Sequence, residues 1–114
     1  VTAAGTGRTP RSAIGAAYRQ TGAHGRVTTW VSCEATCRIV LGGTAAFDGR
    51  KLRLRTVRRS LRGSGRVTMR VKLPRAARQA VSRGRQVTVR LRAKATMGSR
   101  VVVTRRTILV ARPR

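Results

Sequence analysis

The chain has 114 residues, of which 27 are Lys or Arg and only two, Glu34 and Asp48, are acidic, so its formal net charge at pH 7 is +25. So few carboxylates exclude neutralisation by internal ion pairs, and a surface with this field attracts anions. The length allows one modest domain, and no apolar run reaches the roughly 18 residues that a transmembrane helix needs.

Residues 1–25 are rich in Gly, Ala and Thr and show no sustained hydrophobic period. This composition is typical of a flexible linker or a loosely attached lead-in. Within it, the stretch from Ser12 to Gln20 fits either a short helix or a first strand. The chain begins at Val1 without a charged-then-apolar leader, so we expect any export signal to lie upstream. The folded domain is expected to comprise residues 26–114.

Apolar and polar residues alternate from Arg26 onward, the pattern of strands with one buried face. It is clearest in 27–33, 51–55, 66–73 and 86–95, and an extended segment at 37–41 ends at Gly42-Gly43. Residues 97–100 predict a hairpin turn into a last strand, 101–110. The apolar positions of that strand change from odd to even numbers, which predicts a bulge near Arg105-Arg106.

One segment departs from the strand pattern and predicts a helix. Pro74 stands at its start, good helix formers follow, and Gly84 stands at its end. We expect Ala77, Ala80 and Val81 to face the core. The complete pattern predicts a mainly β fold: an antiparallel sandwich of about six or seven strands, with one short helix at about 74–83 between two long strands.

Three stretches resemble a known kind of module: VSCEATCRIVL (31–41), VKLPRAARQAV (71–81) and VTVRLRAKATMGSRVVVTRRTILV (87–110). Their order is similar to that of secreted Ig-like β-sandwich modules found at the tail of actinobacterial extracellular or surface proteins. Over about residues 26–111 the likeness includes the Cys-x3-Cys element, the Leu-Pro-basic-Ala helix and the closing hairpin. Met97-Gly98-Ser99 replaces the acidic turn usual in that hairpin. The resemblance implies a structural or adhesive module without catalysis.

Cys33 and Cys37 are the only cysteines. In a straight strand they would lie roughly 13 Å apart, too far for a disulfide, so a bridge requires the chain to turn through residues 34–36. A disulfide-closed hairpin loop would satisfy this and fit an oxidising compartment. Free buried thiols are the second possibility, and a metal or redox pair the third. A zinc site would need two more ligands, and only His24 is near in sequence.

The sequence offers little for catalysis. General acid–base chemistry needs a group that titrates near neutrality or two carboxylates in contrasting environments, and only His24, Glu34 and Asp48 are available. Gly5-Thr6-Gly7 and Gly63-Ser64-Gly65 lack the features of phosphate-binding loops. We therefore predict that the protein is not an enzyme and takes no cofactor, no metal and no small-molecule substrate.

The alternation gives the positive charge a geometry, because inward apolar residues leave their basic neighbours outward. We predict a cationic lattice on a sheet face that binds polyanions, formed by Arg53, Arg55, Arg66, Arg70, Lys72, Arg90, Arg92 and Lys94. The competing interpretation is that these are ordinary solvated positions filled with Arg by codon bias. Arg supplies 24 of the 27 basic residues, which fits that bias, but codon usage does not explain the missing acids.

Two partner classes fit such a lattice. The first is an anionic envelope polymer, such as a wall polymer, an acidic polysaccharide or anionic lipid headgroups, bound by a non-catalytic extracellular or cell-surface module. The alternative is the nucleic-acid backbone, bound without sequence preference by a cytoplasmic architectural protein. Aromatic residues are only 3% of the chain, too few for the stacking that single-stranded nucleic acid usually needs.

Overall fold

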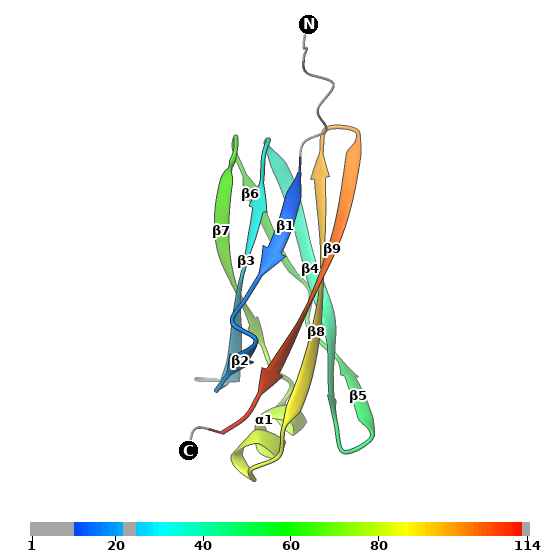
Figure 1. Ribbon diagram of the computed structural model, residues 1–114. Helices are drawn as coiled ribbons and strands as arrows, with labels where there is room; N and C mark the ends of the chain where they lie inside the picture. Colours follow the sequence, from blue (N-terminus) through cyan, green and yellow to red (C-terminus); the bar gives the residue numbers. More distant parts are fainter. Residues whose placement is uncertain (1–10, 22–24, 113–114) are drawn as a thin grey trace, which may run out of the picture.

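The computed structural model describes residues 11–21 and 25–112 (Figure 1). Over these residues it contains nine strands and one helix. In chain order they are β1 (Ser12–Gly15), β2 (Arg19–Gln20), β3 (Arg26–Cys33), β4 (Cys37–Phe47), β5 (Arg50–Arg53), β6 (Val57–Leu61), β7 (Gly65–Lys72), α1 (Arg75–Ser82), β8 (Val87–Met97) and β9 (Arg100–Val110).

The strands form two sheets that pack face to face (Figure 1). The small sheet has the order β1-β3-β7, and the large sheet has the order β2-β9-β8-β4, with β5 and β6 both paired to β4. Apart from the short parallel contact of β2 with β9, the pairings are antiparallel. The predicted antiparallel sandwich is therefore confirmed. Its core consists of the inward residues of both sheets, including Val27, Val31, Met69, Val71, Ile39, Leu41, Val89, Leu91 and Ile108.

The described part of the predicted lead-in belongs to the sandwich. Strand β1 pairs with β3, and β2 then crosses to the large sheet and pairs with β9. Ile14 is buried in the core, and the Leu109 amide donates to the Tyr18 carbonyl. The boundary predicted at residue 26 thus falls too late for residues 12–20, and of the two alternatives the strand is confirmed. Short strands rich in small residues carry too few alternating positions to be recognised.

The bulge predicted near Arg105-Arg106 is absent. Strand β9 pairs with β8 in one continuous register, from Met97 opposite Arg100 to Val87 opposite Val110. The change in apolar parity has another cause. The inward positions of β9 include Arg106, whose guanidinium donates to the Ala16 carbonyl at 3.1 Å, where β1 leaves the small sheet. The outward positions include Val101, which is 49% exposed.

The predicted helix between two long strands is confirmed as α1, and it buries Ala77, Ala80 and Val81 as expected. It lies at one end of the sandwich (Figure 1). Its end is a Schellman motif. The Arg85 amide donates to the Ala80 carbonyl and the Gly84 amide donates to the Val81 carbonyl. Gly84 has a φ of +82°, the left-handed conformation that glycine adopts without steric cost. The terminal glycine therefore sets where the helix ends.

Cys33 and Cys37 form a disulfide with a Cα–Cα distance of 6.5 Å. The disulfide prediction is thus confirmed, but the loop that it closes is not a hairpin, because β3 belongs to the small sheet and β4 to the large one. The bridge joins the two sheets at the corner where the chain crosses between them. Both cysteines are buried, with 4% and 2% of their surfaces exposed.

Replacing both cysteines by Ser should lower the free energy of unfolding by about 2 kcal/mol, the loop-closure value for a ring this small. The loss arises because the unfolded chain regains the freedom that the bridge removes. Chemical denaturation of the oxidised protein and of the double variant measures the difference. A reducing agent should lower the stability of the unmodified protein and leave the variant unchanged. Equal free energies of unfolding for the oxidised protein and the double variant would show that the disulfide does not stabilise the connection between β3 and β4.

Candidate polyanion-binding surface

The outer side of the large sheet carries a continuous set of basic side chains. Register places outward residues of neighbouring strands side by side: Arg90 lies opposite Thr44, which lies opposite Arg53, and Lys94 lies opposite Val40. We call this set of eight residues the large-sheet face, and all eight side chains are exposed. The members are Arg38, Lys51, Arg53, Arg58, Arg90, Arg92, Lys94 and Arg105.

Arg92 and Arg105 form a directly opposed pair of like charges on the large-sheet face, because their positions on β8 and β9 face each other. Directly opposed like charges on an antiparallel pair are destabilising by some tenths of a kcal/mol. On the other side of Arg92, the opposing residue on β4 is Gly42, which has no side chain. A bound anion between the two guanidinium groups would remove this repulsion.

The eight residues predicted to form one lattice lie on both sides of the molecule. Arg53, Arg90, Arg92 and Lys94 belong to the large-sheet face, whereas Arg66, Arg70 and Lys72 lie on the outer side of β7 in the small sheet. Arg55 is exposed in the connection between β5 and β6. The prediction of a single lattice is therefore corrected: alternation identifies the outward residues but not the sheet to which a strand belongs.

The small sheet has its own outward basic set. Arg26 on β3 lies opposite Lys72 on β7, Thr28 lies opposite Arg70, and Ser32 lies opposite Arg66. We call Arg26, Arg66, Arg70 and Lys72 the small-sheet face, and all four side chains are exposed. The two sets point away from each other because the core lies between their sheets.

Trp30 holds one member of the small-sheet face in place. The Arg66 guanidinium lies 4.2 Å from the centroid of the indole ring, which is a cation–π contact. Beneath the indole lies Gly15 on β1, where a Cβ atom would collide with the ring carbons. A glycine at this position thus gives Trp30 room to lie flat on the sheet, and Trp30 in turn supports Arg66.

Neither acidic residue lies on these faces. Asp48, in the turn between β4 and β5, pairs with Arg85 at 2.8 Å, and the side chains of Arg85 and Asp48 are 62% and 44% exposed. Glu34, in the connection between β3 and β4, accepts a hydrogen bond from the Arg11 amide at 2.7 Å. The two carboxylates lie at opposite ends of β4, so they cannot act together on one substrate. Both cationic faces consequently lack an acidic side chain to neutralise them.

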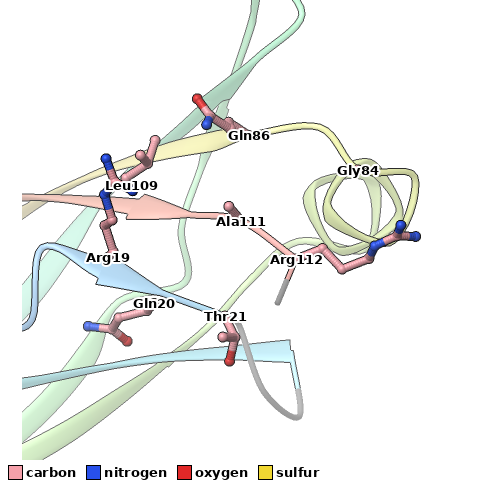
Figure 2. A pocket seen from close by; sticks show the side chains of 8 residues that line it. All are labelled: Arg19, Gln20, Thr21, Gly84, Gln86, Leu109, Ala111 and Arg112. Carbon is pink, nitrogen blue, oxygen red and sulfur yellow. The ribbon is translucent and has the colours of Figure 1, made fainter. Parts of the chain in front are cut away.

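A groove of about 460 Å³ lies between β2, the end of β9 and the turn after α1 (Figure 2). Among the described residues, its lining includes Arg19, Gln20 and Gln86 but no acidic, His or Cys side chain. Arg112 extends from the groove toward the helix and donates to the Ser82 carbonyl at 3.1 Å, near the negative end of the helix dipole. The charged side chains in the described part of the lining are thus all cationic.

The residues that the structure describes contain no cluster of three or more His, Cys, Asp or Glu side chains suited to a metal ion. They also contain no helix with the length and apolar character needed to cross a membrane. His24 and the segment Gly5-Thr6-Gly7 lie outside the described residues. Gly63-Ser64-Gly65 spans the end of the connection from β6 and the first residue of β7, so it belongs to a turn between strands.

Four members of the large-sheet face were not predicted: Arg38, Lys51, Arg58 and Arg105. The alternation around Ile39 and around Leu52 contained the signal for the first two, since both flank inward apolar residues. The predicted bulge near Arg105-Arg106 left the direction of the Arg105 side chain undefined. For Arg58 the surrounding sequence, Val-Arg-Arg-Ser-Leu, gives no signal that selects it over Arg59. Only the pairing of Arg58 with Val40 shows that it faces outward.

Comparison with known proteins concerns the fold alone. No protein-family profile matches the chain, and no curated protein matches it. Among solved structures it is similar to the periplasmic chaperone SfaE, with a TM-score of 0.59 and 16% sequence identity. The match covers 91% of this chain and 58% of the chaperone chain, so this chain spans little more than half of that protein. The fold is an Ig-like β-sandwich.

Proposed function

We propose that this Ig-like domain is a non-catalytic extracellular structural or adhesive module whose large-sheet face binds anionic polymers of the cell envelope. The observation that carries the proposal is the register of β4, β5, β6, β8 and β9. It places eight exposed basic side chains on one face, two of them directly opposed, without an acidic residue among them. A protein that only needed charge for solubility would gain nothing from opposing Arg92 and Arg105.

The spacing of the face suits a polymer with repeated anionic groups. Outward residues recur about every 6.8 Å along a strand and about every 4.8 Å across strands. Phosphate or carboxylate groups that repeat along a chain can therefore contact several side chains at once. Six of the eight positions are arginines: Arg38, Arg53, Arg58, Arg90, Arg92 and Arg105. Their planar guanidinium groups grip phosphate or carboxylate with two hydrogen bonds.

Two observations favour an envelope polymer over nucleic acid. The Cys33–Cys37 disulfide is typical of proteins in oxidising compartments, which include the periplasm and the extracellular space. Trp30, the only tryptophan, is half-buried between Gly15 and Arg66 and is not free to stack on a base. The large-sheet face contains no aromatic side chain at all. Phosphate contact without stacking or base reading is what such a face provides.

Salt titration of binding tests the proposal. Affinities for purified wall teichoic acid, for polyphosphate and for duplex DNA are measured by fluorescence anisotropy across a range of salt concentrations. We expect teichoic acid and polyphosphate to bind at least as tightly as DNA, with affinity that falls linearly on logarithmic axes as counterions are released. Binding to DNA that remains tight at about 0.15 M salt, while the other two polymers dissociate, would contradict the envelope assignment.

A further inference from the structure

The two cationic faces point in opposite directions, so each face can contact a different anionic polymer. We propose that the domain bridges two separate polyanion chains, one on the large-sheet face and one on the small-sheet face. The inference rests on the proposed function, since it assumes the same class of anionic polymer. The domain would bind two polymer chains, and the second binding surface is formed by Arg26, Arg66, Arg70 and Lys72.

The core separates the two ligands. Packed sheets lie about 10 Å apart, and outward side chains add their own length on each side. Polymers on opposite faces are therefore farther apart than the Debye length of about 8 Å at physiological ionic strength, so their mutual repulsion is screened. Inward positions between the faces are filled by apolar residues such as Val71 and Leu91, which leave no route for one short chain to contact both faces.

The basic side chains of the small-sheet face lie in a row, and one of them is held in place. Trp30 fixes the Arg66 guanidinium through the contact at 4.2 Å, and Gly15 leaves space for the indole beneath it. A fixed guanidinium loses less conformational freedom on binding than a mobile one. Arg70 lies two residues farther along the same side of β7 from Thr68, the partner of Trp30, and Arg26 pairs with Lys72 beyond it. These side chains form a row along which a second polymer can lie.

Energy transfer between two labelled polymers tests bridging directly. Short polyphosphate chains, too short to wrap around the sandwich, are labelled with either a donor or an acceptor dye and mixed with the protein. We expect transfer that rises with protein concentration and then falls when each polymer acquires its own protein molecules. Quenching or enhancement of Trp30 fluorescence on binding reports occupation of the small-sheet face, because the chain has one tryptophan.

Two variants with equal charge loss separate the faces. One replaces Arg90, Arg92, Lys94 and Arg105 by Gln, and the other replaces Arg26, Arg66, Arg70 and Lys72 by Gln. Each is expected to keep binding one polymer but to lose at least nine-tenths of the energy transfer. A matched control replaces four arginines elsewhere, Arg59, Arg62, Arg75 and Arg83, and is expected to keep bridging. Circular dichroism confirms that each variant is folded.

The outcomes distinguish this inference from the function on which it rests. Binding of labelled polymer without energy transfer would overturn bridging and leave the proposed function intact. Bridging by both single-face variants at the level of the control would also overturn it, because the charge would then act without regard to position. Absence of any polymer binding would overturn both proposals together.

Discussion

Changing Arg90, Arg92, Lys94 and Arg105 together to Gln should lower the affinity for polyphosphate on the order of 100-fold at about 0.15 M salt. Each lost contact no longer releases a counterion, so the slope of log affinity against log salt should become shallower by about 3, at roughly 0.7 per contact. Fluorescence anisotropy at several salt concentrations measures both quantities. The small-sheet face stays intact in this variant, so binding should weaken without disappearing.

The control for this variant has the same net charge and a different distribution. Arg59, Arg62, Arg75 and Arg83 lie away from the large-sheet face: Arg59 pairs with the inward residue Ile39, Arg62 follows β6, and the others lie on or next to α1. Replacing these four by Gln should change the affinity by less than the face variant does, by roughly tenfold or less. An equal loss in both variants would mean that total charge, and not the face, determines binding.

Gly43→Ala should destabilise the fold by about 3 kcal/mol, the upper end of the range for overpacked sites. Gly43 lies on β4 opposite Leu91, at the centre of the large sheet. A Cβ atom there would collide with the Arg90 carbonyl and the Leu91 Cα of β8. These are backbone atoms, which cannot move away by rotating a side chain, so β4 and β8 would have to separate.

The neighbouring glycine provides a matched control for Gly43→Ala. A Cβ atom at Gly42 would meet only the Thr56 hydroxyl, at 3.8 Å, which is an ordinary van der Waals distance. Gly42→Ala is therefore expected to change the free energy of unfolding by no more than about 0.5 kcal/mol. Chemical denaturation of both variants gives the comparison. Similar stabilities would show that β4 and β8 adapt to a side chain at either position.

Much of the fold follows from local sequence pattern. The alternation in β3, β7 and β8 identifies which residues are buried, and Pro74 and Gly84 bracket the helix. The Cys33–Cys37 disulfide was one of three alternatives that the spacing allowed, and the structure confirms it. These features depend on residues close together in the chain, so a single sequence contains them.

What the sequence lacked was the identity of each strand's neighbours. Arg66 and Arg90 have the same local pattern, yet one lies on the small sheet and the other on the large sheet, because pairing is decided by contacts between distant segments. The same limit hid the opposition of Arg92 and Arg105, which depends on the register of β8 with β9. The sequence therefore indicated which basic residues face outward, but not how they are divided between the two sheets.

The most direct test of the account is a nuclear magnetic resonance titration with polyphosphate that observes the arginine side-chain Nε–H signals. An ordered surface predicts that the signals of Arg90, Arg92 and Arg105 on the large-sheet face move and saturate, and that Arg66 follows on the small-sheet face. Signals of Arg75 and Arg83 at the helix should stay near their starting positions. Equal, unsaturated movement of all arginine signals would contradict the account, because it would show a diffuse cloud of counterions and no binding face.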